Sequence, residues 1–249
     1  MHSGSAPCRN ILMTLCNRLA EHISLALYRA ATSALTPLLP LHLKKRLKRG
    51  REHPERWREK LGFSSLPRPV GKLVWLHAVG LGEVLALRGM IVALQACDPK
   101  LQFLVTSSTL ASADTFVKNI PPRTVHQFLP LDAERYVRRF LDHWRPDLAL
   151  WSERDIWPGL VNQAARRGIP QALINVRMNA GSFQRKRKVR ALYRAVYRNF
   201  VLISAQDDVT AVALTKLDVQ QDIRIGQQRL SLDQLEVHFL ISRLSKLSF

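Results

Sequence analysis

Apolar residues in the middle of the chain gather in short runs that alternate with segments of helical periodicity. The first run, LVWLHAV at residues 73–79, has the continuous apolar pattern of a strand covered on both faces. Six further strand-like runs follow, at residues 101–106, 125–129, 148–151, 171–175, 201–205 and 223–225. Helices are expected between them, at residues 83–96, 111–118, 133–143, 160–167, 185–199 and 207–217. This alternation predicts an α/β fold, a Rossmann-like parallel sheet with helices on both faces.

The amino-terminal part is apolar but interrupted. Its interruptions between residues 11 and 43 are Arg18, Glu21, His22, Arg29, Pro37 and Pro40. Residues 23–41 contain only Arg29 as a full charge, and so approach the roughly 20 apolar residues of a spanning helix without meeting that standard. An interfacial amphipathic helix accounts for both the apolar content and the interruptions. Spanning and interfacial anchors both stay open.

A dense basic cluster follows directly. Its members are Lys44, Lys45, Arg46, Lys48, Arg49, Arg51, Arg56, Arg58 and Lys60. Basic residues beside an apolar segment are attracted to anionic lipids and stay on the cytoplasmic side. Residues 1–66 are therefore predicted to be a membrane-associated apolar helix plus basic segment, and the alternative is a buried core helix followed by a solvated basic helix. Residues 67–230 form the predicted Rossmann-like domain, and residues 231–249 a short carboxyl-terminal tail.

The overall charge narrows the function classes. With 38 Lys and Arg against 19 Asp and Glu, the formal net charge of +19 predicts a polyanionic neighbour, which is nucleic acid, an anionic membrane surface or a phosphorylated substrate. The basic run at residues 184–190 lacks interleaved aromatic residues and any RNA- or DNA-reading motif, which disfavours nucleic acid. The three cysteines are odd in number and lack metal-ligand spacing, which argues against a disulfide scaffold and a zinc site. No metal or cofactor is expected.

Candidate chemistry comes after the first run, because ligands of parallel sheets bind at the carboxyl ends of the strands. The sequence there includes His77, Gly80, Gly82 and Glu83. Glycines let a substrate approach the backbone, and a carboxylate in the first helical turn is a candidate general base. The alternative is that the glycines only shape a turn and Glu83 complements the helix dipole.

Polar and aromatic residues also follow the run at residues 148–151. Glu153, Asp155 and Trp157 offer carboxylates for sugar hydroxyls and an aromatic ring for an apolar sugar face. The alternative is a helix that Asp155 caps, with Pro158 in its first turn.

The run at residues 171–175 leads into Asn175 and Arg177. The guanidinium group offers a fork for a phosphate or carboxylate. A surface ion pair is the alternative role of Arg177.

These motifs, at residues 77–83, 153–158 and 175–178, resemble in order and spacing the successive signatures of the Kdo (3-deoxy-D-manno-octulosonic acid) transferases. The resemblance covers roughly residues 40–230, and includes residues 54–62, which are similar to the family's basic segment after its membrane anchor. It implies a GT-B architecture of two Rossmann-like domains facing a cleft. It also implies a metal-independent, inverting transfer of Kdo from CMP-Kdo to a lipid A precursor, in lipopolysaccharide synthesis at the cytoplasmic face of the bacterial inner membrane.

The resemblance also assigns roles to residues. Glu83 stands at the position of the proton acceptor, Glu153 matches a second acid associated with the transition state, and Arg229 stands where the family has a catalytic lysine. His77, Gly80, Gly82, Asp155, Trp157, Asn175 and Arg177 are the expected substrate-binding residues.

Four positions depart from the family pattern: Gly80 replaces a serine, Asp155 a glutamate, Asn179 a serine and Arg229 the lysine. The last change is not conservative. Residues 231–249 are too few for the nucleotide-binding domain that holds the CMP-sugar. The expectation is an acceptor-binding half that is inactive alone and requires a donor half from elsewhere. The alternative is a non-catalytic, membrane-bound remnant that binds a phosphoglycolipid or a partner protein.

Overall fold

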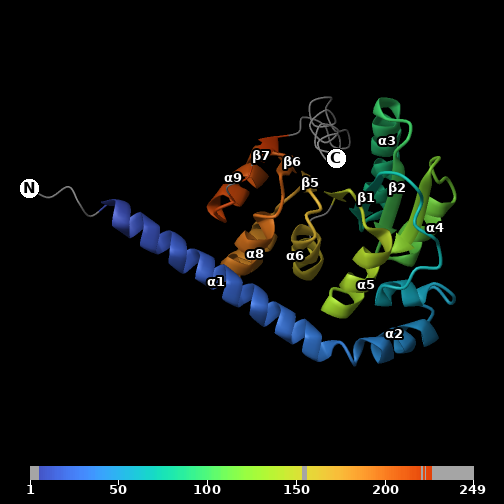
Figure 1. Cartoon of the computed structure of the whole chain (residues 1–249), viewed down its shortest axis with the longest axis horizontal. Helices are drawn as coiled ribbons and strands as arrows, with labels where there is room; N and C mark the ends of the chain where they lie inside the picture. The colour runs from blue at the N-terminus through green and yellow to red at the C-terminus, as the bar shows by residue number, and fades with distance from the viewer. Residues whose placement is uncertain (1–5, 153–155, 220, 222, 226–249) are drawn as a thin grey trace, which may run out of the picture.

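The computed structural model describes residues 6–152, 156–219, 221 and 223–225. Its centre is a parallel sheet of seven strands in the order β3-β2-β1-β4-β5-β6-β7, seen in Figure 1. The strands are β1 (Leu73–Ala78), β2 (Gln102–Ser107), β3 (Thr124–Phe128), β4 (Leu148–Ser152), β5 (Gln171–Val176), β6 (Leu202–Ala205) and β7 (Ile223–Ile225). The predicted α/β fold with a Rossmann-like parallel sheet is confirmed.

The strand order reverses at β1, which pairs with β2 on one side and with β4 on the other. Along the chain, β2 and β3 are added on one side of β1, and β4, β5, β6 and β7 are then added on the other side. A reversal of this kind separates the loops after the two central strands and opens a ligand-binding crevice at their carboxyl ends. The topology therefore points to the ends of β1 and β4.

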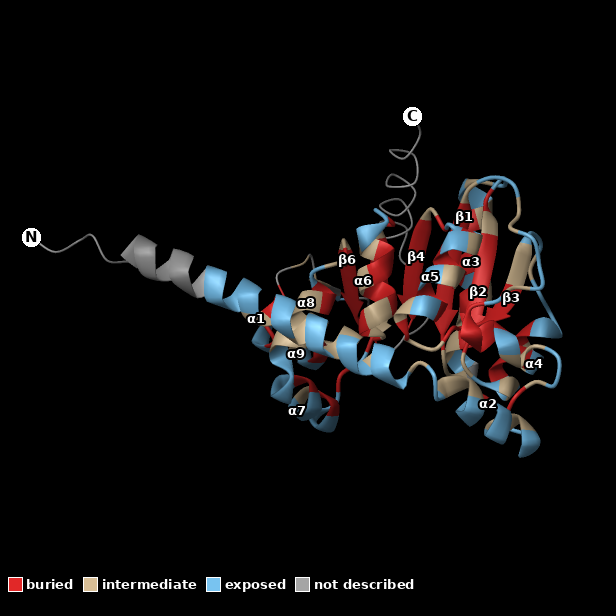
Figure 2. Ribbon diagram, turned by 60° about the horizontal axis from the view of Figure 1, so that its bottom comes forward, coloured by how far each residue is buried: buried red, intermediate tan, exposed pale blue. Residues whose placement is uncertain are grey.

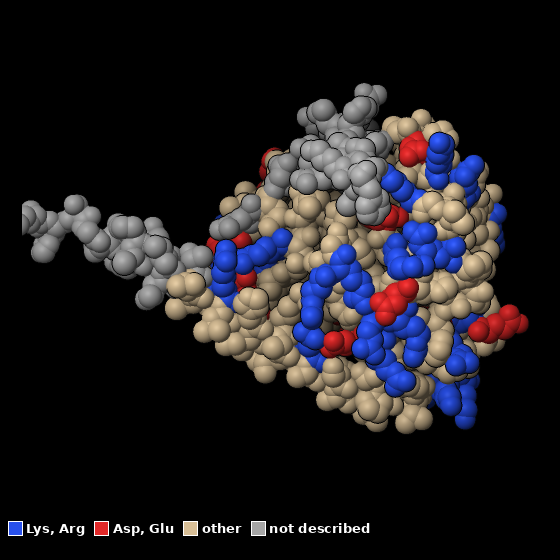
Figure 3. Space-filling view, viewed as in Figure 1, with Lys and Arg blue, Asp and Glu red and all other residues tan. Residues whose placement is uncertain are grey.

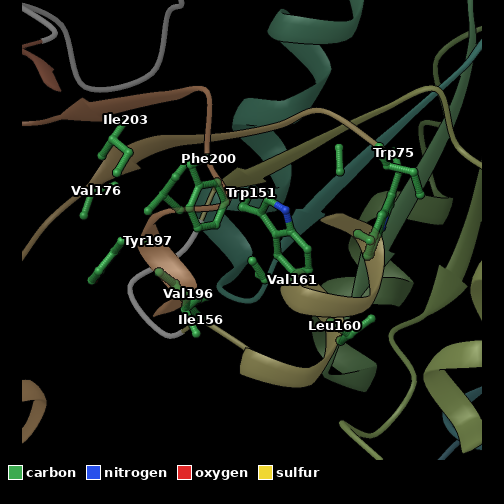
Figure 4. Close-up of a cluster of buried hydrophobic side chains, with 14 of the residues drawn as sticks. Trp75, Trp151, Ile156, Leu160, Val161, Val176, Val196, Tyr197, Phe200 and Ile203 are labelled. Atoms are coloured by element: carbon green, nitrogen blue, oxygen red, sulfur yellow. The ribbon is translucent and has the colours of Figure 1, made fainter. Parts of the chain in front are cut away.

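Helices cover both faces of the sheet. They are α3 (Leu81–Cys97), α4 (Leu110–Val117), α5 (Glu134–Trp144), α6 (Pro158–Arg166), α7 (Ala180–Lys188), α8 (Arg190–Tyr197) and α9 (Asp208–Lys216). Alternate residues of β1 enter different cores, because side chains alternate across a strand. Trp75 joins the core under α5, α6, α8 and α9, which Figure 4 shows around Trp151, whereas Val74 and Leu76 join the core under α3.

The single helix expected at residues 185–199 is wrong, since two helices, α7 and α8, occupy this region. The first begins earlier, where the Asn179 side chain accepts a hydrogen bond from the Ser182 amide at 2.8 Å. Val189 leaves the helical conformation, with φ −122° and ψ 41°, and separates the two axes. The Lys186 amine consequently lies 3.1 Å from the Tyr197 hydroxyl, which turns this member of the basic run into a buried residue.

The amino-terminal segment forms α1 (Ala6–Leu35) and α2 (Leu39–Lys48), with the break near the two prolines. Polar contacts fasten α1 to the domain: its Glu21 pairs with Arg194, and its Arg29 with Glu134. Figure 1 shows α1 crossing the layer of α5, α6 and α8. Among the described residues, no helix combines the length and apolar content that crossing a bilayer requires.

The outer side of α1 remains apolar. Its exposed large apolar side chains are Leu15, Leu19, Ile23, Leu27 and Leu35, and Leu38 and Leu41 continue this surface toward and into α2. Four of them recur every four residues and so lie along one line on the helix. We call Leu15, Leu19, Ile23 and Leu27 the α1 outer line; Figure 2 shows this side of α1 as exposed.

Two residues of the predicted basic cluster pair with acids of the same segment: Lys60, which is buried, and Arg56, which is partly buried. The Lys60 amine is 2.6 Å from the Glu52 carboxylate, and both side chains are less than one tenth exposed. Arg56 pairs with Glu59 at 2.8 Å within the turn that contains the short helix η1 (Trp57–Leu61). A cluster that is uniform in sequence is therefore divided: Lys60 and Arg56 join an internal network, because the acids at positions 52 and 59 compensate their charges.

Candidate functional site

Glu83 lies in the first turn of α3, directly after the carboxyl end of β1. Its Oε2 accepts a hydrogen bond from the Gly80 amide at 2.8 Å, as in a capping box, and the side chain stays half-buried. A Cβ atom on residue 80 would stand 2.7 Å from this oxygen, so glycine is what allows the close approach. Among the described residues, no heavy atom lies within 4 Å of a Cβ built on Gly82, which is exposed. The first turn of α3 is therefore accessible beside a fixed carboxylate.

His77 lies under this turn rather than on its surface. The ring is buried, and its Nδ1 is 2.9 Å from the Thr106 hydroxyl oxygen and 3.1 Å from the Thr106 carbonyl oxygen. Its edge meets the Trp151 ring at a centroid distance of 5.7 Å. In this arrangement His77 holds neighbouring strands together beneath the candidate site.

The loop between β2 and α4 supports the loop that contains Gly80. The Ser112 hydroxyl donates to the Val79 carbonyl at 2.8 Å, and the Thr109 side chain caps the same helix at the Ser112 amide. Lys60 extends the support, since its amine donates to the Ser108 carbonyl at 3.0 Å. None of these contacts was expected from the sequence.

A series of hydrogen-bonded polar side chains lies beside the loop between β2 and α4. The Ser107 hydroxyl lies 2.9 Å from His126 Nε2, and the Arg56 guanidinium lies 3.0 Å from His126 Nδ1. Burial, and then the positive charge of Arg56, lower the pKa of His126 to about 3. His126 is therefore neutral near pH 7 and ties β3 to β2 without adding charge.

The helix after β4 begins differently from the sequence alternative. The N-cap position of α6 is Trp157, so the assignment of this cap to Asp155 is wrong. Asp132, from the segment after β3, caps α6 instead by accepting from the amides of Gly159 and Leu160 at 2.8 and 2.7 Å. Burial raises the pKa of this carboxyl despite these hydrogen bonds. Nothing near Asp132 in the sequence marks it as the cap of a helix 26 residues later.

Trp157 packs part of its ring against the core and so is fixed in place. Its Nε1 is buried and has no hydrogen-bond partner within the described part of the chain. Pro158 begins the helix, as expected. Trp157 thus follows the end of β4 with an indole N–H group that could donate a hydrogen bond to a ligand.

Near the end of β5, Asn175 has a left-handed backbone with φ 57°, and its side-chain oxygen accepts a hydrogen bond from Gln206. Arg177 is exposed. The pKa of Asp207 is lowered by hydrogen bonds from Thr210 and further by the charge of Arg177, so this guanidinium lies near the start of α9. Asn175 is used within the fold, whereas Arg177 faces solvent at the sheet edge.

The described candidates follow three strands along one edge, with Trp157 after β4 between two further groups. His77, Gly80, Gly82 and Glu83 belong to the end of β1, and Asn175 and Arg177 to the end of β5, two strands away. At about 4.8 Å per strand, the groups are roughly 10 Å apart. Glu153, Asp155 and Arg229 lie outside the described residues. Within the described ranges, no three His, Cys, Asp or Glu side chains gather in a way that could hold a metal ion.

Comparison with known proteins gives one consistent result. A sequence model of the family described as 3-Deoxy-D-manno-octulosonic-acid transferase (kdotransferase) matches residues 55–228. The "Probable 3-deoxy-D-manno-octulosonic acid transferase, mitochondrial" of Arabidopsis thaliana is 40% identical over 159 residues, which are 64% of this chain and 36% of that protein. The 3-deoxy-D-manno-octulosonic acid transferase of Rickettsia felis is 32% identical over 176 residues, 71% of this chain and 37% of that protein. The enzyme of that name from Haemophilus influenzae is 31% identical over 159 residues, 63% of this chain and 37% of that protein.

The match covers most of the folded domain but only part of the length of the relatives. It includes the segments that form the sheet from β1 to β7 and the helices between them. The chain spans little more than a third of the length of these three relatives. Since the family model covers more than half of the chain, the chain belongs to the 3-deoxy-D-manno-octulosonic acid transferase family.

Proposed function

We propose that this domain is the acceptor side of a Kdo transferase, where a lipid-borne sugar hydroxyl is presented to Glu83. The observation that carries the proposal is the position of Glu83, whose half-buried carboxylate stands in the first turn after β1 beside the exposed Gly82. The carboxyl end of a strand at a reversal of strand order is where parallel α/β sheets bind ligands. Membership of the family supplies the reaction class, which is glycosyl transfer.

The substrates follow from the family resemblance. The donor is CMP-Kdo and the acceptor a lipid A precursor, in an inverting, metal-independent transfer across the cleft of a GT-B enzyme. Glu83 removes the proton of the attacking hydroxyl, and the oxygen then attacks the Kdo anomeric carbon as CMP leaves. Arg177 at the same sheet edge is placed to bind an acidic group of a substrate.

Transfer needs a domain that holds CMP-Kdo in line with the acceptor hydroxyl. A general base contributes about 10²–10⁴-fold to a rate, whereas positioning two reactants contributes roughly 7–11 kcal/mol. Glu83 supplies only the first of these. The chain alone is therefore expected to be inactive.

The test uses two substitutions of Glu83 that separate its chemical role from its capping role. Glu83→Gln keeps an oxygen that accepts from the Gly80 amide, while Glu83→Ala loses it. The full chain is incubated with CMP-Kdo and a lipid A precursor, alone and with a separately expressed family donor domain. We expect product only with the donor domain, a loss of at least about 100-fold in both variants, and a loss of stability of about 1 kcal/mol in Glu83→Ala alone. Full activity of Glu83→Gln would show that Glu83 is not the general base.

A second candidate is a non-catalytic protein that binds a phosphoglycolipid or a partner protein at a membrane. The capping bond of Glu83 favours it, because that bond gives the carboxylate a purely structural use. Absence of transfer with every donor domain, together with lipid binding, would select this candidate.

We also propose that the protein lies on an anionic membrane surface through α1. The α1 outer line faces away from the domain, while polar pairs fasten the opposite side. Figure 3 shows the outer side of α1 as a band largely free of charge, with Lys and Arg nearby. An interfacial helix has this arrangement. The cytoplasmic face of a bacterial inner membrane stays a prediction for the location.

A further inference from the structure

A groove of about 400 Å³ lies between α7 and α9. Met178, after the end of β5, and the first turn of α9, after the end of β6, contribute to it. It therefore begins at the same edge of the sheet as the candidate site. Its size falls within the range of small-molecule sites.

The wall of the groove is mostly apolar. Met178 and Phe183 line it from the α7 side, and Val209, Val212 and Ala213 line it from α9. Val209 and Val212 are 73% and 52% exposed. Their spacing of three residues places both on one face of α9, so the helix presents an apolar stripe to the groove instead of to the core. Exposed apolar surface in a hollow indicates a site for an apolar ligand group.

Basic residues border this apolar wall. Lys216 lines the groove at the last turn of α9, and Arg187 follows Phe183 by four residues on the same side of α7. The exposed Arg177 directly precedes Met178. One acid, Asp208, also lines the groove, at the first turn of α9. Lys216 stands at the opposite end of α9 from Asp208, so the groove has a basic end that complements an anion.

We propose that the α7–α9 groove binds an alkyl chain of an anionic amphiphile, whose charged group lies among the basic residues at the rim. This inference rests on the proposed function and extends it: the groove would hold one acyl chain of the phosphorylated acceptor lipid. The ends of β5 and β6 lie two and three strands from the end of β1, which is roughly 10–15 Å. One acceptor molecule can span this distance between Glu83 and the groove.

The position of α1 gives the amphiphile a route from a membrane. α1 packs along α8, which contacts α7, and Figures 1 and 2 both place α8 and α9 beside the amino-terminal half of α1. The α1 outer line begins in this half. A bilayer held against α1 would therefore be close to the groove.

The experiment uses dodecyl phosphate with a photoreactive diazirine at the end of its chain, added to the full-length protein below its micelle concentration. We expect the label on peptides of α7 and α9. Val212→Asp places a charge in the groove and should reduce groove labelling at least tenfold, as should Val209→Asp. Val92→Asp changes an equally exposed valine (58%) on α3 and should leave labelling unchanged. Circular dichroism of each variant establishes that it is folded.

Two comparisons separate the alkyl chain from the charge. Shortening the unlabelled competitor from dodecyl to decyl phosphate should weaken competition about fourfold per methylene group that occupied the groove. Lys216→Glu should weaken the binding of dodecyl phosphate several-fold and leave the binding of neutral dodecyl maltoside unchanged. Lys100→Glu, at an exposed position outside the groove, should change the binding of neither compound. Inorganic phosphate should compete poorly, because the alkyl chain of the ligand provides most of the binding free energy.

Labelling confined to α1, or equal labelling of the α7 and α9 peptides in wild type and Val212→Asp, would overturn the inference. So would a dimer of the chain, seen by analytical ultracentrifugation, that Val212→Asp dissociates, since a second copy would then occupy the groove. The transfer assay distinguishes the two proposals. Groove labelling without any transfer would support the amphiphile site and contradict the proposed transferase function. Glu83-dependent transfer that Val212→Asp does not alter, with no groove labelling, would support the transferase function and contradict the amphiphile site.

Discussion

The hydroxyl group of Tyr28 lies 2.5 Å from Oδ2 of Asp132, 104 residues further along the chain. The same carboxylate caps α6, so one side chain connects α1, the segment after β3 and the helix after β4. The amino-terminal helix is therefore part of the folded domain.

Tyr28→Phe is expected to destabilise the protein by about 1–3 kcal/mol, because the partly buried Asp132 carboxylate loses one of its three hydrogen bonds. Urea unfolding measures this change. Tyr136→Phe provides the comparison, since its hydroxyl donates to the uncharged Thr36 carbonyl oxygen and its loss should cost less. A larger effect of Tyr136→Phe would contradict the assigned importance of Asp132.

The second prediction concerns pH and His126. Its folded pKa of about 3 lies below the usual 6.5, so the unfolded chain binds a proton that the folded protein does not bind between these values. Stability from this group is complete above pH 6.5 and is lost as the pH falls toward 3, by at most about 5 kcal/mol. His126→Asn should flatten the fall in urea stability across this window. His22→Asn, at an exposed position, should leave the slope unchanged; an equal slope in both variants would show that other groups dominate.

Most of the sheet could be predicted from the sequence, because apolar runs covered on both faces are unmistakable when helical segments separate them. The expected strand at residues 223–225 coincides with β7, and the others differ from the observed strands by one residue at one or both ends. The break at Val189 could not be predicted, since residues 185–199 are compatible with one continuous helix and the bend depends on where Lys186 and Tyr197 meet.

The site could be predicted only in part. Glu83, Gly80 and Arg177 follow strands, so the rule for parallel sheets places them at one edge. The contacts that hold this edge, from Ser112 to Val79 and from Lys60 to Ser108, join residues more than 30 positions apart and leave no local pattern. The sequence predicts Lys60 as part of a membrane-associated or solvated basic segment, because nothing local shows that Glu52 is its buried partner.

The third prediction tests the internal pair of Lys60 and Glu52. Lys60→Ala leaves the buried Glu52 carboxylate with Arg46 as its remaining ion-pair partner among the described residues, and should cost roughly 3–5 kcal/mol in urea unfolding. The double variant Glu52→Gln, Lys60→Met removes both charges and should recover much of this loss. Lys48→Ala, at an exposed position in the same basic cluster, should change stability by less than about 0.5 kcal/mol. Equal effects of Lys60→Ala and Lys48→Ala would mean that Lys60 is solvated.

The last prediction concerns the membrane surface. Leu19→Asp and Leu27→Asp alter two members of the α1 outer line that are 61% and 66% exposed, and should weaken binding to phosphatidylglycerol vesicles at least tenfold each. Inserting a leucine side chain is worth about 1.5–3 kcal/mol, and a carboxylate there also repels anionic lipid.

Point substitutions are better suited to this test than deletion of residues 11–60, since deletion would also remove Tyr28, Glu52 and Lys60 from the folded domain. Val92→Asp is the control, because α3 covers the opposite face of the sheet from α1. Vesicle flotation at rising salt completes the measurement: binding should fall as salt screens α2, whose last turn contains Lys45, Arg46 and Lys48. If Leu19→Asp and Leu27→Asp float with vesicles as well as Val92→Asp does, α1 does not bind the membrane, and its apolar side has another use.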